Sequence, residues 1–154
     1  SADAGEEEYA FTLSAEAVDD HIDWVMHVEH GEEGFDLFTA GTYPNTNSGS
    51  WDLFYPIEGE SVNVLDAEYE ISSDTEKEIT FSVPEGAAQH AGVSITFSRD
   101  GDLRNIILLD EEGLIHTIEW NESTHAGFVL SPGYNDGVKS CWGADLQNTE
   151  CTVS

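Results

Sequence analysis

The sequence is very poor in basic residues, with 4 Lys and Arg against 32 Asp and Glu and a formal net charge of −28. Phosphate recognition needs clustered Lys and Arg, so this composition excludes a basic nucleic-acid-binding surface. Apolar runs are also short. None approaches the roughly 20 residues that a membrane-spanning helix needs, and the sequence predicts no transmembrane segment.

Familiar catalytic motifs are missing as well. The chain contains no Gly-x-Ser-x-Gly nucleophile motif and no His-Glu-x-x-His zinc motif. Ser, His, Asp and Glu are so numerous that chance pairs and triads are expected, and none stands out. We therefore assign no catalytic residue and favour a non-enzymatic function, with enzymatic activity left open.

Enough apolar material is present for one folded domain. The 154 residues are 39% hydrophobic and 10% aromatic, which is too rich for a chain disordered throughout. Residues 1–8 (SADAGEEE) read as an acidic N-terminal arm. We expect a single domain over residues 9–154, closed by a tail at its C-terminus.

Alternation of apolar and polar residues predicts β-strands along most of the chain. Ile22, Trp24, Met26 and Val28 occupy every second position, and turn-rich segments such as 99–102 and 110–113 separate similar runs. One helical turn is expected after Ser14, acting as its N-cap. The sequence predicts an all-β domain of nine or ten antiparallel strands, forming a sandwich or an up-and-down barrel.

The two cysteines, Cys141 and Cys151, lie near the C-terminus. A tetrahedral zinc site would need further ligands, and no histidine lies between them. We expect a local disulfide, which favours an oxidising extracellular or periplasmic location. The first residues, Ser1 to Gly5, are typical of a mature terminus left by a removed signal peptide.

The tail from Tyr134 to Trp142 (YNDGVKSCW), together with Cys151, resembles the C-terminal end of some small secreted bacterial lipoproteins of unknown function. The resemblance covers only this tail. The chain lacks the N-terminal cysteine that carries the lipid in a lipoprotein. The resemblance implies export and a tail disulfide, but no activity.

The acidic composition has two interpretations. Adaptation to a saline habitat is favoured, because salt shortens the range of charge repulsion to about 3 Å at 1 M. Binding of divalent cations is the other interpretation, with Asp100 and Asp102 as candidate calcium ligands. A regular EF-hand is excluded, because Arg104 and Asn105 stand where that loop requires an acid and a glycine.

Aromatic residues supply the candidate ligand-binding positions. Trp51, Tyr134 and Trp142 are the residues we single out for stacking on a carbohydrate. Trp51 lies in a predicted strand, where a core position is the favoured interpretation. Trp142 follows Cys141 directly, and packing over the disulfide would explain it equally well.

The N-terminal strand is a candidate assembly element. Tyr9, Phe11 and Leu13 alternate along it, and a strand at the end of a chain can be donated to the sheet of the next subunit. Pairing within its own domain is the favoured interpretation of this strand. We expect a secreted, non-enzymatic surface or interaction protein, and self-association through this strand is the assembly hypothesis. The alternative is a carbohydrate-binding or carbohydrate-active domain with an extracellular polysaccharide as partner.

Overall fold

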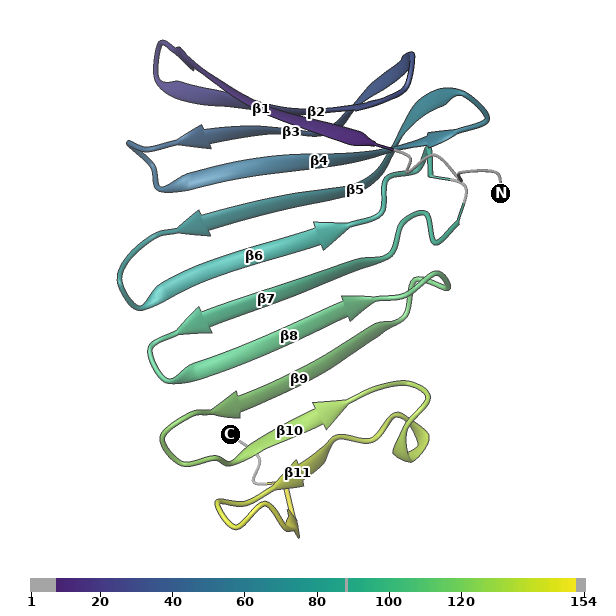
Figure 1. Cartoon of the computed structure of the whole chain (residues 1–154). Helices are drawn as coiled ribbons and strands as arrows, with labels where there is room; N and C mark the ends of the chain where they lie inside the picture. The colour runs from purple at the N-terminus through teal and green to yellow at the C-terminus, as the bar shows by residue number, and fades with distance from the viewer. Residues whose placement is uncertain (1–7, 88, 152–154) are drawn as a thin grey trace, which may run out of the picture.

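The computed structural model describes residues 8–87 and 89–151. They form one antiparallel sheet in which the strands follow one another in chain order (Figure 1). Twelve strands lie in this part of the chain: β1 (Tyr9–Val18), β2 (His21–His30), β3 (Glu33–Tyr43), β4 (Ser48–Ile57), β5 (Glu60–Ile71), β6 (Glu76–Ser82), β7 (Ser94–Asp100), β8 (Leu103–Leu109), β9 (Ile115–Asn121), β10 (Gly127–Leu130), β11 (Ser140–Trp142) and β12 (Asn148–Thr149). A short 3-10 turn, η1 (Asn135–Gly137), precedes β11.

The predicted all-β antiparallel architecture is confirmed. The sheet has more strands than the nine or ten expected, because two short strands, β11 and β12, form in the tail. It is also open: within the described residues β1 and β12 lie at opposite ends of the sheet and pair with no common neighbour. The acidic arm predicted at residues 1–8 falls outside the described residues except for Glu8.

The helical turn predicted after Ser14 is wrong. Strand β1 continues through Val18, and all ten of its residues pair with β2. Ala15 lies opposite Trp24 and Ala17 opposite Ile22, so the small residues of this segment face large side chains across the strand pair. Cross-strand pairing therefore overrides a local capping signal. The chain reverses at Asp19, whose φ is +48°.

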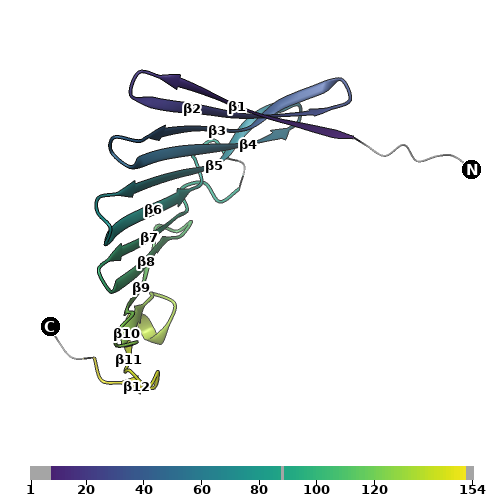
Figure 2. The ribbon, with the colours of Figure 1, turned by 60° about the vertical axis from the view of Figure 1, so that its left-hand side comes forward.

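The sheet is bent into two arms (Figure 2), one built mainly by β1–β5 and the other by the later strands. Two register shifts fall in the first arm: Leu37 of β3 is the extra residue opposite the Met26–His27 step of β2, and Val64 of β5 is the extra residue opposite the Leu53–Phe54 step of β4. Such bulges increase local twist and bend the strand that carries them. They account for curvature in the arm that contains them.

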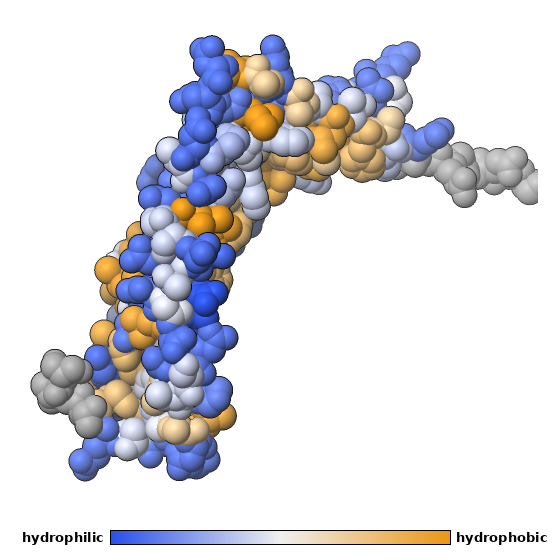
Figure 3. Space-filling view, turned by 90° about the vertical axis from the view of Figure 1, so that its left-hand side faces the viewer, coloured by the Kyte–Doolittle hydropathy of each residue, from blue (hydrophilic) through white to orange (hydrophobic). Residues whose placement is uncertain are grey.

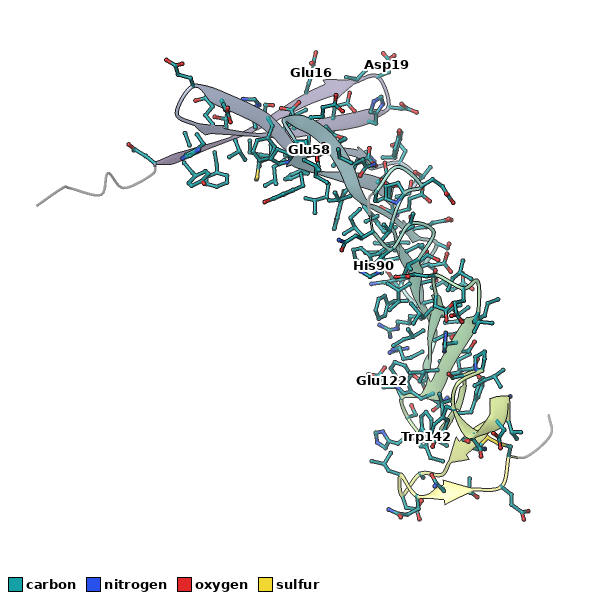
Figure 4. The ribbon with its side chains drawn as sticks, turned by 90° about the vertical axis from the view of Figure 1, so that its right-hand side faces the viewer. Glu16, Asp19, Glu58, His90, Glu122 and Trp142 are labelled. Carbon is teal, nitrogen blue, oxygen red and sulfur yellow. A yellow bond between two sulfur atoms is a disulfide. The ribbon has the colours of Figure 1, made fainter. Side chains whose placement is uncertain are left out.

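Strand register assigns each side chain to the concave or the convex face, because residues directly opposite one another in an antiparallel sheet share a face. One concave row runs across six strands, and we call it the apolar row: Gly49, Tyr69, Ile79, Phe97, Ile106 and Ile118. In Figure 4, Trp142 points toward the concave side and Glu16 away from it. These labelled side chains agree with the register.

The sheet has no second layer in the described residues. Val28 and Ala67 are the only buried apolar side chains there, with exposed fractions of 3% and 5%. A sheet normally buries one face against another element. Figure 3 shows apolar side chains gathered on the concave side of the first arm, with further apolar patches on the outer side of the second arm.

The predicted disulfide is present. Cys141 in β11 is joined to Cys151, and their Cα atoms are 5.2 Å apart. The bond closes the short loop that carries β12, so it holds the end of the sheet where strands are shortest. None of the helices in the described part of the chain is long or apolar enough to cross a membrane.

Substitution of Gly49 can test how closely the first arm is packed. It is buried, and a Cβ at this position would lie 2.6 Å from Tyr69 Cε1 and 2.7 Å from the Gly41 carbonyl oxygen. Because backbone would have to shift, we expect Gly49→Ala to lower the free energy of unfolding by about 1–3 kcal/mol in urea titration.

Gly86→Ala is the matched control, because a Cβ added there would meet no atom within 4 Å and the backbone is not left-handed. This change should leave the stability the same or raise it slightly, through the unfolded chain. Equal stability of the two variants would contradict the packing described at Gly49.

Candidate functional site

An apolar hollow of about 500 Å³ lies on the concave face of the first arm. Strands β1 to β6 each contribute to it, because the alternate residues of each strand point to this side. Its lining residues are Leu13, Trp24, Phe38, Ala40, Thr42, Trp51, Leu53, Leu65, Ala67 and Phe81.

The walls of the hollow carry almost no free polar group. The indole N–H of Trp24 donates a hydrogen bond to Thr42 Oγ1 at 3.1 Å, so these two polar groups of the lining are paired with each other and the indole N–H of Trp51 is the third. Trp51 is 43% exposed and lies near Tyr69, with ring centroids 6.3 Å apart. The hollow therefore offers hydrocarbon contact far more than hydrogen bonding.

A second concave row, parallel to the apolar row, contains three of the four basic residues of the chain. Lys77 in β6 lies opposite Arg99 in β7, which lies opposite Arg104 in β8. Ile71 and Trp120 flank them in the neighbouring strands. We call Lys77, Arg99 and Arg104 the basic row.

The two arginines are held by short local contacts. Arg99 Nε and Arg104 Nη1 both donate to the carbonyl oxygen of Gly101, at 3.2 and 2.8 Å. Arg104 also pairs with Glu122, which follows β9 and lies on the concave side in Figure 4. The Arg104 side chain is only 17% exposed. The turn after β7 thus fixes the direction of both guanidinium groups.

A shallow groove of about 360 Å³ joins the basic row to the apolar row. Its walls combine the aliphatic and aromatic side chains of the apolar row with the stems and charged heads of the basic row. Tyr69, Ile79, Phe97 and Ile106 line it together with Lys77, Arg99 and Arg104. No Asp or Glu occupies either row.

The acidic residues of the central strands lie on the convex face instead. Asp52 and Asp66 are opposite each other across β4 and β5, and Glu68 follows on the same face. Partial burial and the neighbouring Asp66 carboxylate raise the pKa of Asp52 above its ordinary value. The convex face therefore carries like charges at close range, while the concave face carries the cations.

A hydrogen-bonded chain of Ser131, His116 and Asp110 lies in the second arm. His116 Nδ1 is 2.8 Å from Ser131 Oγ, and His116 Nε2 is 2.9 Å from Asp110 Oδ2. The hydrogen bond from His116 lowers the pKa of Asp110, and its carboxylate also accepts backbone N–H bonds from Glu112 and Leu114. These bonds join β9, the turn before it and the residue after β10, and they order the turn between β8 and β9.

Comparison with protein-family models, with curated protein sequences and with solved structures finds no match in any of the three.

The predicted aromatic positions do not form one site. Trp51 lies in the hollow of the first arm, whereas Tyr134 and Trp142 lie at the far end of the sheet. Tyr134 is 53% exposed beside the disulfide-closed tail. The indole N–H of Trp142 donates to the carbonyl oxygen of His125 at 2.7 Å, so this ring is held against the turn between β9 and β10.

The candidate calcium ligands lie at the turn between β7 and β8. Asp100 ends β7 on the convex face, and the carboxylate of Asp102 accepts a hydrogen bond from Ser123 Oγ at 2.5 Å. Within residues 8–87 and 89–151, no group of three or more His, Cys, Asp or Glu side chains is arranged to hold a metal ion. This arrangement gives no support for a calcium site at the two aspartates.

The candidate assembly strand is β1, which pairs along its whole length with β2 of the same chain. Tyr9 stacks on His30 with ring centroids 4.4 Å apart, and Leu13 reaches the rim of the hollow. Phe11 is 63% exposed. The other edge of β1 has no strand beside it in the described part of the chain.

Sequence reasoning missed the basic row and most of the hollow. Lys77, Arg99 and Arg104 are dispersed in the sequence, and only the register of three strands brings them together. A usable signal was present in the scarcity of cations. Arg99 begins the predicted turn 99–102 and Arg104 follows it, but their pairing depends on the shorter turn at Gly101 and Asp102 that the structure has.

Asp52 provides a pH test of the convex face. Because its pKa is raised in the folded state, its ionised form opposes folding at neutral pH. We expect Asp52→Asn to raise stability at pH 7 by a few tenths to about 1 kcal/mol, as measured by urea unfolding. This gain should vanish as the pH falls below the ordinary carboxyl range, where Asp52 is neutral in both states.

Asp74→Asn makes the same change in net charge in the exposed turn between β5 and β6. A smaller gain is expected there, because Asp74 is not on the convex acidic strands. An equal gain for both variants at pH 7 would show that net charge, and not the local repulsion at Asp52, limits stability.

Proposed function

We propose that this chain is a non-enzymatic extracellular interaction protein that binds its partner on the concave face of the sheet. The observation that carries this proposal is the exposed apolar surface of β1–β6, which has no covering layer in the described residues. Large exposed apolar patches mark interaction sites in soluble proteins.

The shape of the apolar surface indicates a binding site and not only a set of exposed side chains. The hollow is concave, draws residues from six neighbouring strands and is lined by four large aromatic side chains, those of Trp24, Phe38, Trp51 and Phe81. Concave apolar sites with few polar groups are the usual form of small-ligand sites. Binding of a partner would be driven by the removal of water from these apolar walls.

An extracellular setting agrees with two further features. The disulfide between Cys141 and Cys151 would persist in an oxidising compartment. The acidic convex face would be stabilised by a saline medium, because salt screens repulsion between exposed carboxylates.

Trp51 tests the concave face directly. The native protein is expected to bind the neutral apolar dye N-phenyl-1-naphthylamine with an increase in dye fluorescence. Trp51→Ala should weaken binding by about tenfold or more, because a large aromatic wall contributes about 1.5–3 kcal/mol of apolar contact. Dye titration at 1 M NaCl measures both constants.

Trp142→Ala is the control, since Trp142 lies on the same face but at the far end of the sheet. Its dye affinity should match that of the native protein. Equal affinity in Trp51→Ala, or no binding by the native protein, would contradict the proposal. Binding of a soluble glucan that is lost in Trp142→Ala but kept in Trp51→Ala would support the carbohydrate alternative instead.

Self-association through β1 is a second candidate, favoured by the unpaired outer edge of this long strand in the described part of the chain. An exposed strand edge offers backbone donors and acceptors to another chain. Tyr9, Phe11 and Leu13 are each more than half exposed beside that edge, at 52%, 63% and 54%. A second copy could therefore extend the sheet at its first strand.

Light scattering at 1 M NaCl tests this candidate, with particles larger than the 16.9 kDa monomer expected. Thr12→Lys should return the protein to monomer, because lysine in an edge strand opposes strand addition. Gln89→Lys makes the same charge change in the exposed connection after β6 and should leave the size unchanged. A monomer at every protein concentration would exclude self-association.

A further inference from the structure

The distribution of cations over the sheet is the starting observation. The chain has 4 Lys and Arg, and three of them lie side by side on the concave face in the basic row. Like charges directly opposite in neighbouring strands oppose each other, so this arrangement is unfavourable without an anion to offset it. The many acids of the same strands point to the other face.

Internal contacts neutralise only part of the basic row. Arg104 forms an ion pair with Glu122. The Nε–H group of Arg99 donates a hydrogen bond to a backbone carbonyl oxygen. The ammonium group of Lys77 makes neither a hydrogen bond nor an ion pair with the described residues. Two of the three cations thus keep donors for an external anion, within a protein whose overall charge is −28.

The basic row continues directly from the apolar hollow. Phe81, which lines the hollow, and Lys77 are four residues apart on the same face of β6, or roughly 13 Å at the rise of a β-strand. Ile79 lies between them and belongs to the apolar row. A ligand could therefore follow one uninterrupted apolar path and end at the cations.

We propose that the concave face binds a single lipid molecule that has an acyl chain and an anionic headgroup. The acyl chain lies in the hollow, where the walls offer hydrocarbon contact and the polar groups of Trp24 and Thr42 are already paired. The headgroup meets Lys77 and Arg99, which form charge-assisted hydrogen bonds to its oxygens. This inference rests on the proposed function and names its ligand class.

Charge complementarity disfavours a second copy of the chain on this face. Apposed concave faces would bring the basic rows toward rows that contain no acid, and Glu122 on this side is already paired with Arg104. Packing against a convex face would instead press Asp52, Asp66 and Glu68 onto the apolar hollow. Burying unpaired carboxylates against hydrocarbon is costly, so neither arrangement fits as well as an amphipathic anion.

Three probes with the same chain and different heads test the inference: dodecanoate, 1-dodecanol and dodecyltrimethylammonium. Displacement of N-phenyl-1-naphthylamine measures each affinity at 1 M NaCl and pH 8, where the long-range repulsion of the acidic protein is screened to about 3 Å. We expect dodecanoate to bind about tenfold more tightly than 1-dodecanol, and dodecyltrimethylammonium to bind most weakly.

Lys77→Gln locates the headgroup. It should weaken dodecanoate binding by about tenfold and leave 1-dodecanol binding unchanged, whereas Lys77→Arg should keep most of the preference for the carboxylate. Lys139→Gln is the matched control. The Lys139 Nζ atom lies 3.8 Å from the ring centre of Phe128 and outside the basic row, so its loss should not alter dodecanoate binding.

The outcomes separate this inference from the proposed function. Equal binding of dodecanoate and 1-dodecanol, together with no effect of Lys77→Gln, would overturn the anionic ligand but leave the hollow as a binding site. Absence of binding for all three probes and for the dye would contradict both. A doubling of particle mass that excludes every probe would identify a second copy as the occupant and overturn the inference.

Discussion

Cross-strand register is the constraint on which the rest of this structure depends. Ladder pairing fixes which residues lie opposite one another, and the two-residue period of a strand then sends each side chain to one face or the other. A shift of one residue in β6 would move Lys77 to the convex face and Glu78 to the concave face. The cations therefore lie on one face and the acids of the same strands on the other because of strand pairing alone.

This separation has a cost in stability that the solvent can reduce. Carboxylates such as Asp52 and Asp66 lie close together on the convex face, and they repel one another most strongly at low ionic strength. Apolar side chains on the concave face are exposed to water at the same time. The isolated sheet in dilute buffer therefore lacks two stabilising contributions, which salt and a partner on the concave face would supply.

The sequence was sufficient to predict most of the strands and the disulfide, but not the second half of β1, the short strands β11 and β12 or the shape of the sheet. Alternation identified β2 from Ile22 to Val28, and the spacing of Cys141 and Cys151 suggested their bond. Alternation alone cannot state whether a sheet closes, because an open sheet and a barrel have the same local pattern. Such patterns say only that one face is apolar.

The candidate site was harder to predict than the fold for a related reason. Trp51 could be named from its residue type, but its neighbours in the hollow come from five other strands. Lys77 and Arg104 are distant in sequence and are brought together only through Arg99 between them. Residue composition reveals the scarcity of cations, while their grouping is a property of register.

The sequential strand order has a consequence for how the molecule forms. In the described sheet each strand from β2 to β11 pairs with the strands that precede and follow it in the chain, so the sheet can grow hairpin by hairpin without closing any long loop. Low contact order of this kind is associated with rapid folding. As in a repeat array, coupling between distant strands passes through those between them, so damage near one terminus should spread only gradually toward the other.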